Sequence, residues 1–297
     1  MGAEYSVTEM ISAKAVTFGD KKTYSLANIK PDEGRVALQI FGSEPDVMAR
    51  AAEILSTRDF GEGYVSPCAI DINMGCPVHK IFSNGEGSAL MRDPELIYRI
   101  TRAVKGSTDL PVTVKHRTGI DDAHLNASEC AMAAESGGAS LITVHGRTKA
   151  QMYSGSVNRE IIKNVKQSVH IPVIANGDIL SGDDALSMLS DTGADGIAIG
   201  RGAVGNPFIF REIICALEGE SFTVPTLEER VKVALWQLRL AIEDKGERVA
   251  IPESRKQIAS YLYSFRGAAA IRAKINQATE YGEIERIFAE ALKEENT

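Results

Sequence analysis

The feature that most constrains the fold is a regular alternation of short apolar runs with segments that have helical spacing. We expect strands at residues 5–9, 36–40, 69–73, 111–115, 141–145, 172–176 and 196–200. We expect helices at residues 44–56, 94–104, 128–136, 158–169, 181–190 and 207–217, and a loop or hairpin around Lys21 and Lys22. Near-continuous apolar strands that alternate with helices are typical of a parallel sheet covered by helices.

Each predicted strand has a polar residue or a glycine at or near its carboxyl end, which is where a ligand site can form. These residues are Glu9, Gln39, Asn73, Lys115, His145, Asn176, Gly200 and Arg201. In a parallel barrel the carboxyl ends of all strands share one rim, whereas a doubly wound sheet binds its ligand at one switch point. The pattern therefore favours a (β/α)₈ TIM-type barrel over residues 1–224. Seven of the eight strands are found, and the missing strand–helix unit is the first one.

The pattern changes after Pro225. Helices are expected at residues 226–244, 254–265, 268–277 and 283–292, which predicts a C-terminal α-helical domain over residues 225–297. Between Lys245 and Lys274, seven Lys and Arg residues stand against two Glu residues, with three aromatic residues among them. A solvated helix face with core aromatics and a nucleic-acid surface both fit this composition, because basic and aromatic residues suit phosphate and base contacts.

Charge and cysteine usage limit the setting in which the protein works. The chain has 297 residues and a net charge of −7, which argues against a protein that coats nucleic acid indiscriminately but leaves room for a local basic face. No apolar run approaches the length of a membrane span, and the first residues do not form a signal peptide. The four cysteines form no CxxC pair and have no metal-type spacing with His. We therefore expect free thiols, no metal, no membrane and a cytoplasmic location.

One cysteine lies where a reactive group is expected. The apolar run at 69–73 leads into Gly75-Cys76-Pro77, which cannot continue the strand, because Gly75 permits unusual backbone angles and Pro77 lacks an N–H donor. Cys76 is therefore expected on a sharp turn at the carboxyl end of a strand, facing a cleft. A buried and inert thiol is the alternative, and it is the commoner fate of a lone cysteine.

Two glycine-containing turns predict a phosphate site. Asn176-Gly177-Asp178 and Gly200-Arg201 follow the last two predicted strands. Glycines there let backbone amides approach a phosphate, and the loops after the last two strands of a barrel are its usual phosphate site. Each turn alone more often marks a simple chain reversal, but the two together favour a phosphorylated ligand.

Three further strand-end side chains indicate what this ligand is. Lys115 could form a structural ion pair, form a Schiff base, or lie as a cation beside an electron-rich cofactor ring. His145 could donate to a ligand or bridge to a carboxylate, and Gln39 could pair with the edge of a planar heterocycle. An amide, an amine and an imidazole above a phosphate pocket fit a flavin better than a sugar phosphate.

Five stretches of the chain occur together in one known family. They are residues 72–77 (Ile-Asn-Met-Gly-Cys-Pro), 114–119 (Val-Lys-His-Arg-Thr-Gly), 144–148 (Val-His-Gly-Arg-Thr), 174–178 (Ile-Ala-Asn-Gly-Asp), and 200–201 with 205–207 (Gly-Arg, Gly-Asn-Pro). With these motifs in this order, the sequence resembles the tRNA-dihydrouridine synthases, and most nearly their bacterial DusB-type branch. The resemblance extends from about Gly2 to Lys274.

The resemblance implies a flavin-dependent oxidoreductase that reduces a uridine of tRNA to 5,6-dihydrouridine, with FMN as cofactor and NADPH as reductant. It implies that Gln39, Lys115 and His145 hold the isoalloxazine ring. The residues implied for the ribityl chain and phosphate are Asn176, Gly177, Asp178, Gly200 and Arg201. Cys76 would give a proton to C5 of uracil, since thiols ordinarily keep their proton at neutral pH.

The resemblance also implies how tRNA is bound, with the protein acting as a monomer. The implied RNA contacts are Asn73 and Arg117 at a uracil flipped out of its stack, Arg147 and Lys149 at tRNA phosphate, and Arg255 and Lys256 on the basic helical face. In the family, a C-terminal helical domain grips the body of the tRNA.

The chain departs from the family at its amino end. The family usually opens with a strand that ends in a Pro-Met motif and lies against the flavin, and this sequence starts after it. This departure agrees with the count of seven strands and predicts an amino-truncated barrel. Three alternatives stay open: a catalytically impaired RNA-binding remnant, a small-molecule flavin oxidoreductase similar to dihydroorotate dehydrogenase, and, more distantly, an aldolase that uses Lys115 as a Schiff base.

Overall fold

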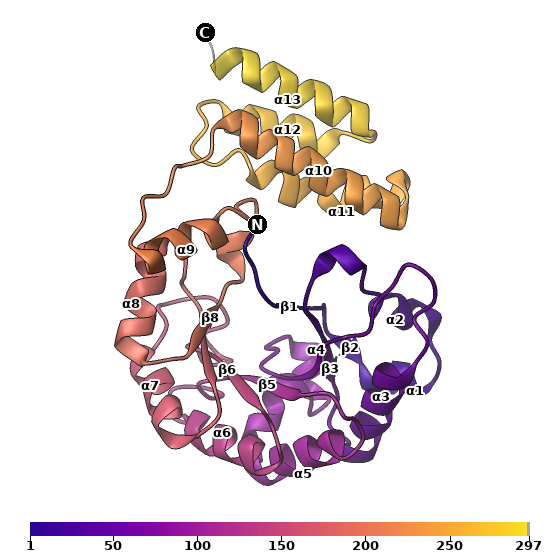
Figure 1. Ribbon diagram of the computed structural model, residues 1–297, viewed down its shortest axis with the longest axis vertical. Coiled ribbons are helices and arrows are strands. Elements are labelled where there is room, and N and C mark those ends of the chain that lie inside the picture. Colours follow the sequence, from indigo (N-terminus) through magenta and orange to yellow (C-terminus); the bar gives the residue numbers. More distant parts are fainter. Residues whose placement is uncertain (296–297) are drawn as a thin grey trace. The chain divides into compact units, whose positions relative to one another are not determined.

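The computed structural model describes residues 1–295, so that residues 296 and 297 of the predicted helical domain lie outside the described residues. The chain forms two compact units (Figure 1). The larger unit contains residues 3–179 and 184–199, and the smaller unit contains residues 1–2, 180–183 and the described part of the chain from Gly200 onward. The predicted boundary between residues 224 and 225 falls inside the smaller unit.

The larger unit is built on a parallel sheet. Its strands are β1 (Ser6–Val7), β2 (Ile11–Ser12), β3 (Val36–Phe41), β4 (Ala69–Met74), β5 (Val112–Arg117), β6 (Leu141–His145), β7 (Val173–Asn176) and β8 (Gly196–Ala198). All pairings are parallel, and the spatial order is β1-β3-β4-β5-β6-β7-β8, with β2 also paired to β3. Figure 1 shows the curvature of this sheet and the helices along its outer side. The predicted barrel-type fold of alternating strands and helices is confirmed.

The strands β1 and β2 occupy a single position beside β3. Val7 pairs with Ala37 and Ile11 pairs with Ile40, so four steps along one chain match three along the other, which is the geometry of a β-bulge. The sheet thus has seven strand positions, as predicted. Within residues 1–295, β8 pairs only with β7, and β1 and β2 pair only with β3, so that the sheet keeps two free edges.

Helices and 3₁₀ turns connect the strands of this unit. They are α1 (Ala13–Thr17), α2 (Lys21–Ser25), η1 (Pro31–Glu33), α3 (Pro45–Thr57), α4 (His79–Ser83), η2 (Gly87–Arg92), α5 (Pro94–Lys105), α6 (Ala127–Ser136), α7 (Arg159–Ser168) and α8 (Gly182–Thr192). The loop or hairpin predicted around Lys21 was wrong, because α1 and α2 form there. Ser12 and Asp20 cap these helices by accepting hydrogen bonds from the backbone N–H groups of Ala15 and Thr23.

The alternation of side chains along the strands separates an apolar face from a polar one. Ile70, Ile72 and Met74 of β4 are fully buried, whereas Asp71 and Asn73 lie on the opposite face. The register brings the polar faces of four strands together, from β3 to β6. The paired residues are Gln39 with Asp71, Asp71 with Thr113, Asn73 with Lys115, and Arg117 with His145. This face carries the candidate site.

The smaller unit is helical. It contains η3 (Arg201–Ala203), α9 (Ile209–Glu218), α10 (Leu227–Lys245), α11 (Glu247–Ser260), α12 (Ala268–Gln277) and α13 (Tyr281–Glu295). Leu238, Ile258 and Phe288 are among the fully buried residues of its core. The predicted C-terminal helical region is confirmed, although α11 begins seven residues earlier than predicted because Pro252 is accommodated within its second turn.

Candidate active site

Cys76 lies on the predicted turn directly after β4, and only 8% of it is exposed. The side chain of Asn73 accepts hydrogen bonds from the backbone N–H groups of Gly75 (3.1 Å) and Cys76 (2.9 Å). On the other side, the backbone N–H and the hydroxyl of Ser88 donate to the carbonyl of Cys76 at 3.1 Å and 2.8 Å. We call residues 75–77 the Cys76 turn. These bonds hold its backbone in one position.

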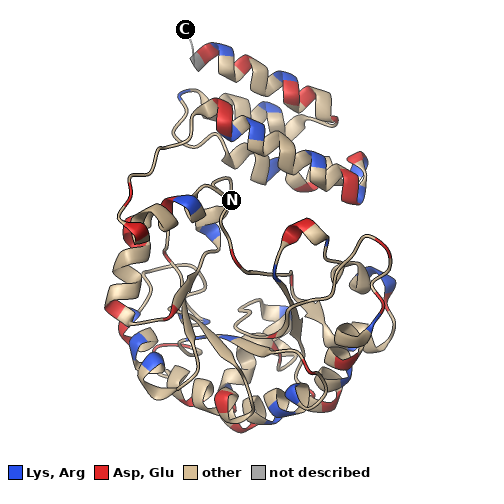
Figure 2. Ribbon diagram, viewed as in Figure 1, with Lys and Arg blue, Asp and Glu red and all other residues tan. Residues whose placement is uncertain are grey.

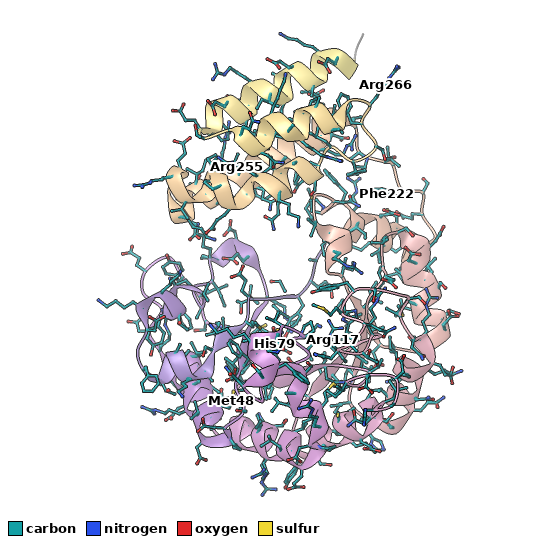
Figure 3. The ribbon with its side chains drawn as sticks, turned by 180° about the vertical axis from the view of Figure 1, so that it is seen from behind. Met48, His79, Arg117, Phe222, Arg255 and Arg266 are labelled. Carbon is teal, nitrogen blue, oxygen red and sulfur yellow. The ribbon has the colours of Figure 1, made fainter. Side chains whose placement is uncertain are left out.

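Arg117 at the end of β5 is the third anchor of this turn, and Figure 3 labels its side chain. Its Nε donates to the carbonyl of Gly75 at 2.7 Å, and its Nη1 donates to the carbonyls of Thr148 (2.9 Å) and Met152 (3.0 Å). Arg117 thereby ties the Cys76 turn to the loop after β6. The hydrogens of Nη2 lie outside these three bonds, and the contact of Arg117 with uracil stays a prediction.

A chain of side-chain hydrogen bonds connects the strands beneath the turn. Asn73 Nδ2 donates to Gln39 Oε1 at 2.7 Å, Gln39 Nε2 donates to Asp71 Oδ2 at 2.7 Å, and the Thr113 hydroxyl donates to Asp71 Oδ1. Both ends of the Gln39 amide are thus bonded within the protein. The sequence interpretation placed this amide against a flavin ring. One hydrogen of Gln39 Nε2 is outside these bonds.

Charged groups surround the turn at close range. Burial lowers the pKa of Lys115 to about 8, with Arg117 acting in the same direction and with Asp71 and Cys76 opposing it. Burial raises the pKa of Asp71 to about 6, while Thr113, Gln39 and Lys115 act to lower it. Lys115 therefore interacts electrostatically with both the Asp71 carboxyl and Cys76 and remains largely protonated near neutral pH.

His145 at the end of β6 is kept neutral. Burial, together with the neighbouring cations Arg117, Lys115 and Arg147, lowers its pKa to about 3, with Asp178 opposing them. Within residues 1–295, neither ring nitrogen of His145 is hydrogen-bonded to the protein. A neutral imidazole with unused nitrogens can donate one hydrogen bond to a ligand and accept another.

The turn after β7 is a tight left-handed one. Gly177 has φ +117° and Asp178 has φ +53°, and a Cβ on Gly177 would lie 2.5 Å from Val157 Cγ1. Asn176, just before, donates its side-chain amide to the carbonyl of Ala198 on β8 at 2.8 Å. The predicted residues Asn176, Gly177 and Asp178 thus form one compact element next to His145.

Arg147 takes a different position from the one predicted. It is 2% exposed, and its Nη2 forms an ion pair with Asp178 Oδ2 at 2.7 Å while its Nε donates to the carbonyl of Ser154. Its Nη1 is buried without a hydrogen-bond partner among the described residues. Arg147 therefore holds the loop after β6 against the Gly177 turn, and the predicted phosphate contact does not fit its burial.

Lys149 lies nearer the surface, beside the segment that follows the Cys76 turn. Its Nζ is 4.2 Å from the centre of the Phe82 ring, and the guanidinium carbon of Arg92 is 4.4 Å from the same centre. Phe82 belongs to α4, whose first residue His79 is labelled in Figure 3. Two cations at one aromatic ring make a basic surface on the segment that follows the Cys76 turn.

The remaining predicted residues belong to the smaller unit. Gly200 and Arg201 are exposed at the start of η3. Arg255 donates from its Nε and Nη2 to the carbonyl of Ala278 at the end of α12, and its contact with RNA stays a prediction. Lys256 is exposed and lines a shallow depression of about 350 Å³ together with Ser260, Arg272 and Asn276.

The predicted basic face of the helices is less basic than the sequence count implied. Figure 2 shows acidic and basic residues interspersed over α10 to α13. Lys245 pairs with Glu253 and Lys274 pairs with Glu290, each at 2.9 Å. Exposed pairs of this kind stabilise little, but they reduce the positive potential available to phosphate.

Asp71, Thr113 and Ser88 were missed by the sequence interpretation. Their roles come from hydrogen bonds between neighbouring strands or from a 3₁₀ turn, which a linear motif does not display. The one available signal was the carboxylate of Asp71 inside an otherwise apolar run, two residues before Asn73.

The residues present fit a flavin. Lys115 and His145 are polar groups that make no hydrogen bond within the part of the chain described, and they lie on one face of the sheet near the Gly177 turn. Polar groups left unpaired at a site are what the heteroatoms of a flavin ring require. Within residues 1–295, no three His, Cys, Asp or Glu residues gather as metal ligands. In the same residues, no helix has the length and apolar character needed to cross a membrane.

Comparisons with known proteins agree on one family. The family described as dihydrouridine synthase (Dus) matches residues 1–296. A protein of Synechocystis sp. named probable tRNA-dihydrouridine synthase 1 is 39% identical, over 96% of this chain and 78% of its own length. Proteins named probable tRNA-dihydrouridine synthase are 39% identical in Rickettsia conorii (93% of this chain, 82% of theirs) and 35% identical in Treponema pallidum (97% and 86%).

Proposed function

Because this chain belongs to the dihydrouridine synthase family, as its motifs predicted, we propose that it reduces uridine in tRNA to 5,6-dihydrouridine. In this proposal the flavin is FMN and the reductant is NADPH. When bound, the flavin supplies the hydride that reaches C6 of uracil. The chain itself binds the reactants, holds the uracil and provides the proton.

The observation that carries the proposal is the Cys76 turn, which is fixed by Asn73, Ser88 and Arg117. The thiol of Cys76 gives its proton to C5 of uracil, which breaks the S–H bond and forms a C–H bond. The sulfur is left as a thiolate. Lys115 and Arg117 interact electrostatically with Cys76, and their positive charges stabilise the thiolate at that moment.

The cofactor site in this proposal combines the polar face of the sheet with the glycine turns. Lys115 and His145 hold the flavin ring, and Gln39 contributes the hydrogen of its Nε2 that lies outside the bond to Asp71. The ribityl chain and phosphate are assigned to Asn176, Gly177, Asp178, Gly200 and Arg201. Backbone N–H groups at glycines suit a phosphate because no side chain blocks its approach.

The RNA contacts follow the same logic. Asn73 and the Nη2 group of Arg117 contact the uracil, which must leave its stack to reach the site. Lys149 near Phe82 and Lys256 on α11 meet tRNA phosphate. Since tRNA is the substrate, we place the activity in the cytoplasm.

The test replaces one sulfur and leaves the rest of the site intact. We expect Cys76→Ala to keep its flavin absorbance but to lose at least about 100-fold in dihydrouridine formation on unmodified tRNA, in line with the loss of a general acid. Cys215→Ala, which removes a thiol from α9, is the matched control and should keep the activity. Dihydrouridine formed at the normal rate by Cys76→Ala would reject the proton-donor role.

A non-catalytic RNA-binding protein is the second candidate function. The two free edges of the sheet favour it, because a flavin site in a barrel is shaped by strands on all sides. Absorbance of the purified chain at flavin wavelengths decides between the two. A colourless, folded protein that still binds tRNA would support this second function.

A further inference from the structure

Asp71 has no role in the proposal so far, yet it lies at the centre of the hydrogen bonds beneath the Cys76 turn. It is 3% exposed and sits in the middle of β4, where its register partners are Gln39 on β3 and Thr113 on β5. Both of its oxygens accept hydrogen bonds from these partners. A buried carboxylate is costly to keep, so its two donors are needed to hold it.

In the series of hydrogen bonds from the Cys76 turn to Asp71, the group nearer the turn is always the donor and the group nearer Asp71 is always the acceptor. Asp71 accepts from the NH₂ group of Gln39, whose oxygen accepts from the NH₂ group of Asn73. The oxygen of Asn73 in turn accepts from the backbone N–H groups of Gly75 and Cys76. We call Asp71, Gln39 and Asn73 the amide chain.

The direction is set from both ends. An amide can turn over and exchange its oxygen for its NH₂ group, whereas an ionised carboxylate can only accept and a backbone N–H group can only donate. If Gln39 turned over, its oxygen would face Asp71, and its NH₂ group would face the NH₂ group of Asn73. Asn73 would then have to turn over as well and would lose the two N–H groups of the Cys76 turn.

We propose that Asp71 is a positioning residue, which fixes the direction of the amide chain and thereby the place of the Cys76 turn. The role of this turn in catalysis rests on the proposed function, whereas the hydrogen-bond direction does not. Asp71 itself touches neither thiol nor substrate in this scheme. It acts through Gln39 and Asn73.

The test moves the acidic end of the amide chain by one residue. In Gln39→Glu, two carboxylates face each other, so the bond to Asp71 is lost and the repulsion displaces the group that accepts from Asn73, most strongly at about pH 8, where the pair does not readily share a proton. In the double variant Gln39→Glu with Asp71→Asn, the amide introduced on β4 donates to the carboxylate introduced on β3, and that carboxylate can still accept from Asn73. The link from β4 through residue 39 to Asn73 is then restored.

The measurement is the rate at which iodoacetamide alkylates Cys76 in the purified full chain, followed by mass spectrometry of the peptide. We expect Gln39→Glu to raise this rate about fivefold, as the loss of about one ordinary hydrogen bond would do. Adding Asp71→Asn should bring the rate back to within about twofold of the unaltered chain. In the control, Gln39→Glu with Asp195→Asn, the alkylation rate should stay as high as in Gln39→Glu. Asp195 accepts hydrogen bonds from Lys166 and from the N–H of Val173, away from the amide chain.

Two results would overturn the inference. One is an unchanged alkylation rate in Gln39→Glu; the other is a double variant as fast as Gln39→Glu alone. A carboxylate that served only general stability would give the first result, since the bonds that hold the Cys76 turn would then not depend on it. Far-UV circular dichroism of each variant establishes that it is folded. The assay uses neither added flavin nor tRNA, so it can fail independently of the activity test on Cys76→Ala.

Discussion

Replacing Gly177 by Ala tests whether the turn after β7 is as constrained as its geometry indicates. The backbone there has φ +117°, outside the range that an L-residue adopts easily, and this strain costs about 2 kcal/mol. The added Cβ would also lie 2.5 Å from Val157 Cγ1 and 3.0 Å from His145 Cδ2. Overpacking of this kind costs about 1–3 kcal/mol. We therefore expect Gly177→Ala to lower the free energy of unfolding by about 3–5 kcal/mol.

A matched control separates strain from overpacking. Gly193 has φ +65°, and a Cβ there would meet no atom within 4 Å, so Gly193→Ala should cost only about 1–2 kcal/mol. In the double variant with Val157→Ala, the overpacking part should be recovered as a favourable coupling of about 1–2 kcal/mol.

The assay is urea unfolding followed by far-UV circular dichroism. Tryptophan fluorescence is unsuitable, because the single Trp of the chain, Trp236, belongs to α10 of the smaller unit and does not report on the turn. A Gly177→Ala variant no less stable than Gly193→Ala would refute the reasoning. It would mean that Val157 and His145 move aside at little cost.

Two further predictions concern the acid limb of stability and the RNA surface. Burial lowers the pKa of His116 to about 4, so the unfolded chain binds its proton first, and stability is lost as pH falls from about 6.5 towards 4, by at most about 3 kcal/mol. His116→Gln should flatten this loss in urea midpoints measured across that range, and an unchanged slope would contradict the assignment. The raised pKa of Asp71 has the opposite effect on stability as pH falls. This effect is the same in both proteins, so it cancels when their urea midpoints are compared. Lys149→Ala should weaken tRNA binding and reduce the salt slope by about 1, whereas Lys166→Ala, whose amine is paired with Asp195, should not; equal slopes in the two variants would remove Lys149 from the RNA surface.

The strands and the helical region were predictable because they depend on local patterns. Buried parallel strands require unbroken apolar runs, and β6 was found at its observed ends, Leu141 and His145. The helices α1 and α2 were missed because five residues are too few to display a helical period, and only their caps, Ser12 and Asp20, mark them.

The site was only partly predictable, because its contacts join residues that are distant in sequence. The sequence correctly placed Cys76 on a turn after a strand. It could not show that the amide of Gln39 donates to Asp71, since that contact depends on the register of β3 against β4. For Arg147, the family resemblance implied a contact with tRNA phosphate. Its burial follows from the ion pair with Asp178, which only the folded chain brings near.

The three anchors of Cys76 come from separate parts of the chain, and the bond from Arg117 to Gly75 spans 42 residues. Such contacts close late, after the intervening strand and helix have assembled. The Cys76 thiol is therefore exposed to solvent for a time while the polypeptide emerges from the ribosome. Oxidants would reach it most easily in the nascent chain, and a pulse of peroxide during synthesis should mark Cys76 far more than the same pulse given to the finished protein.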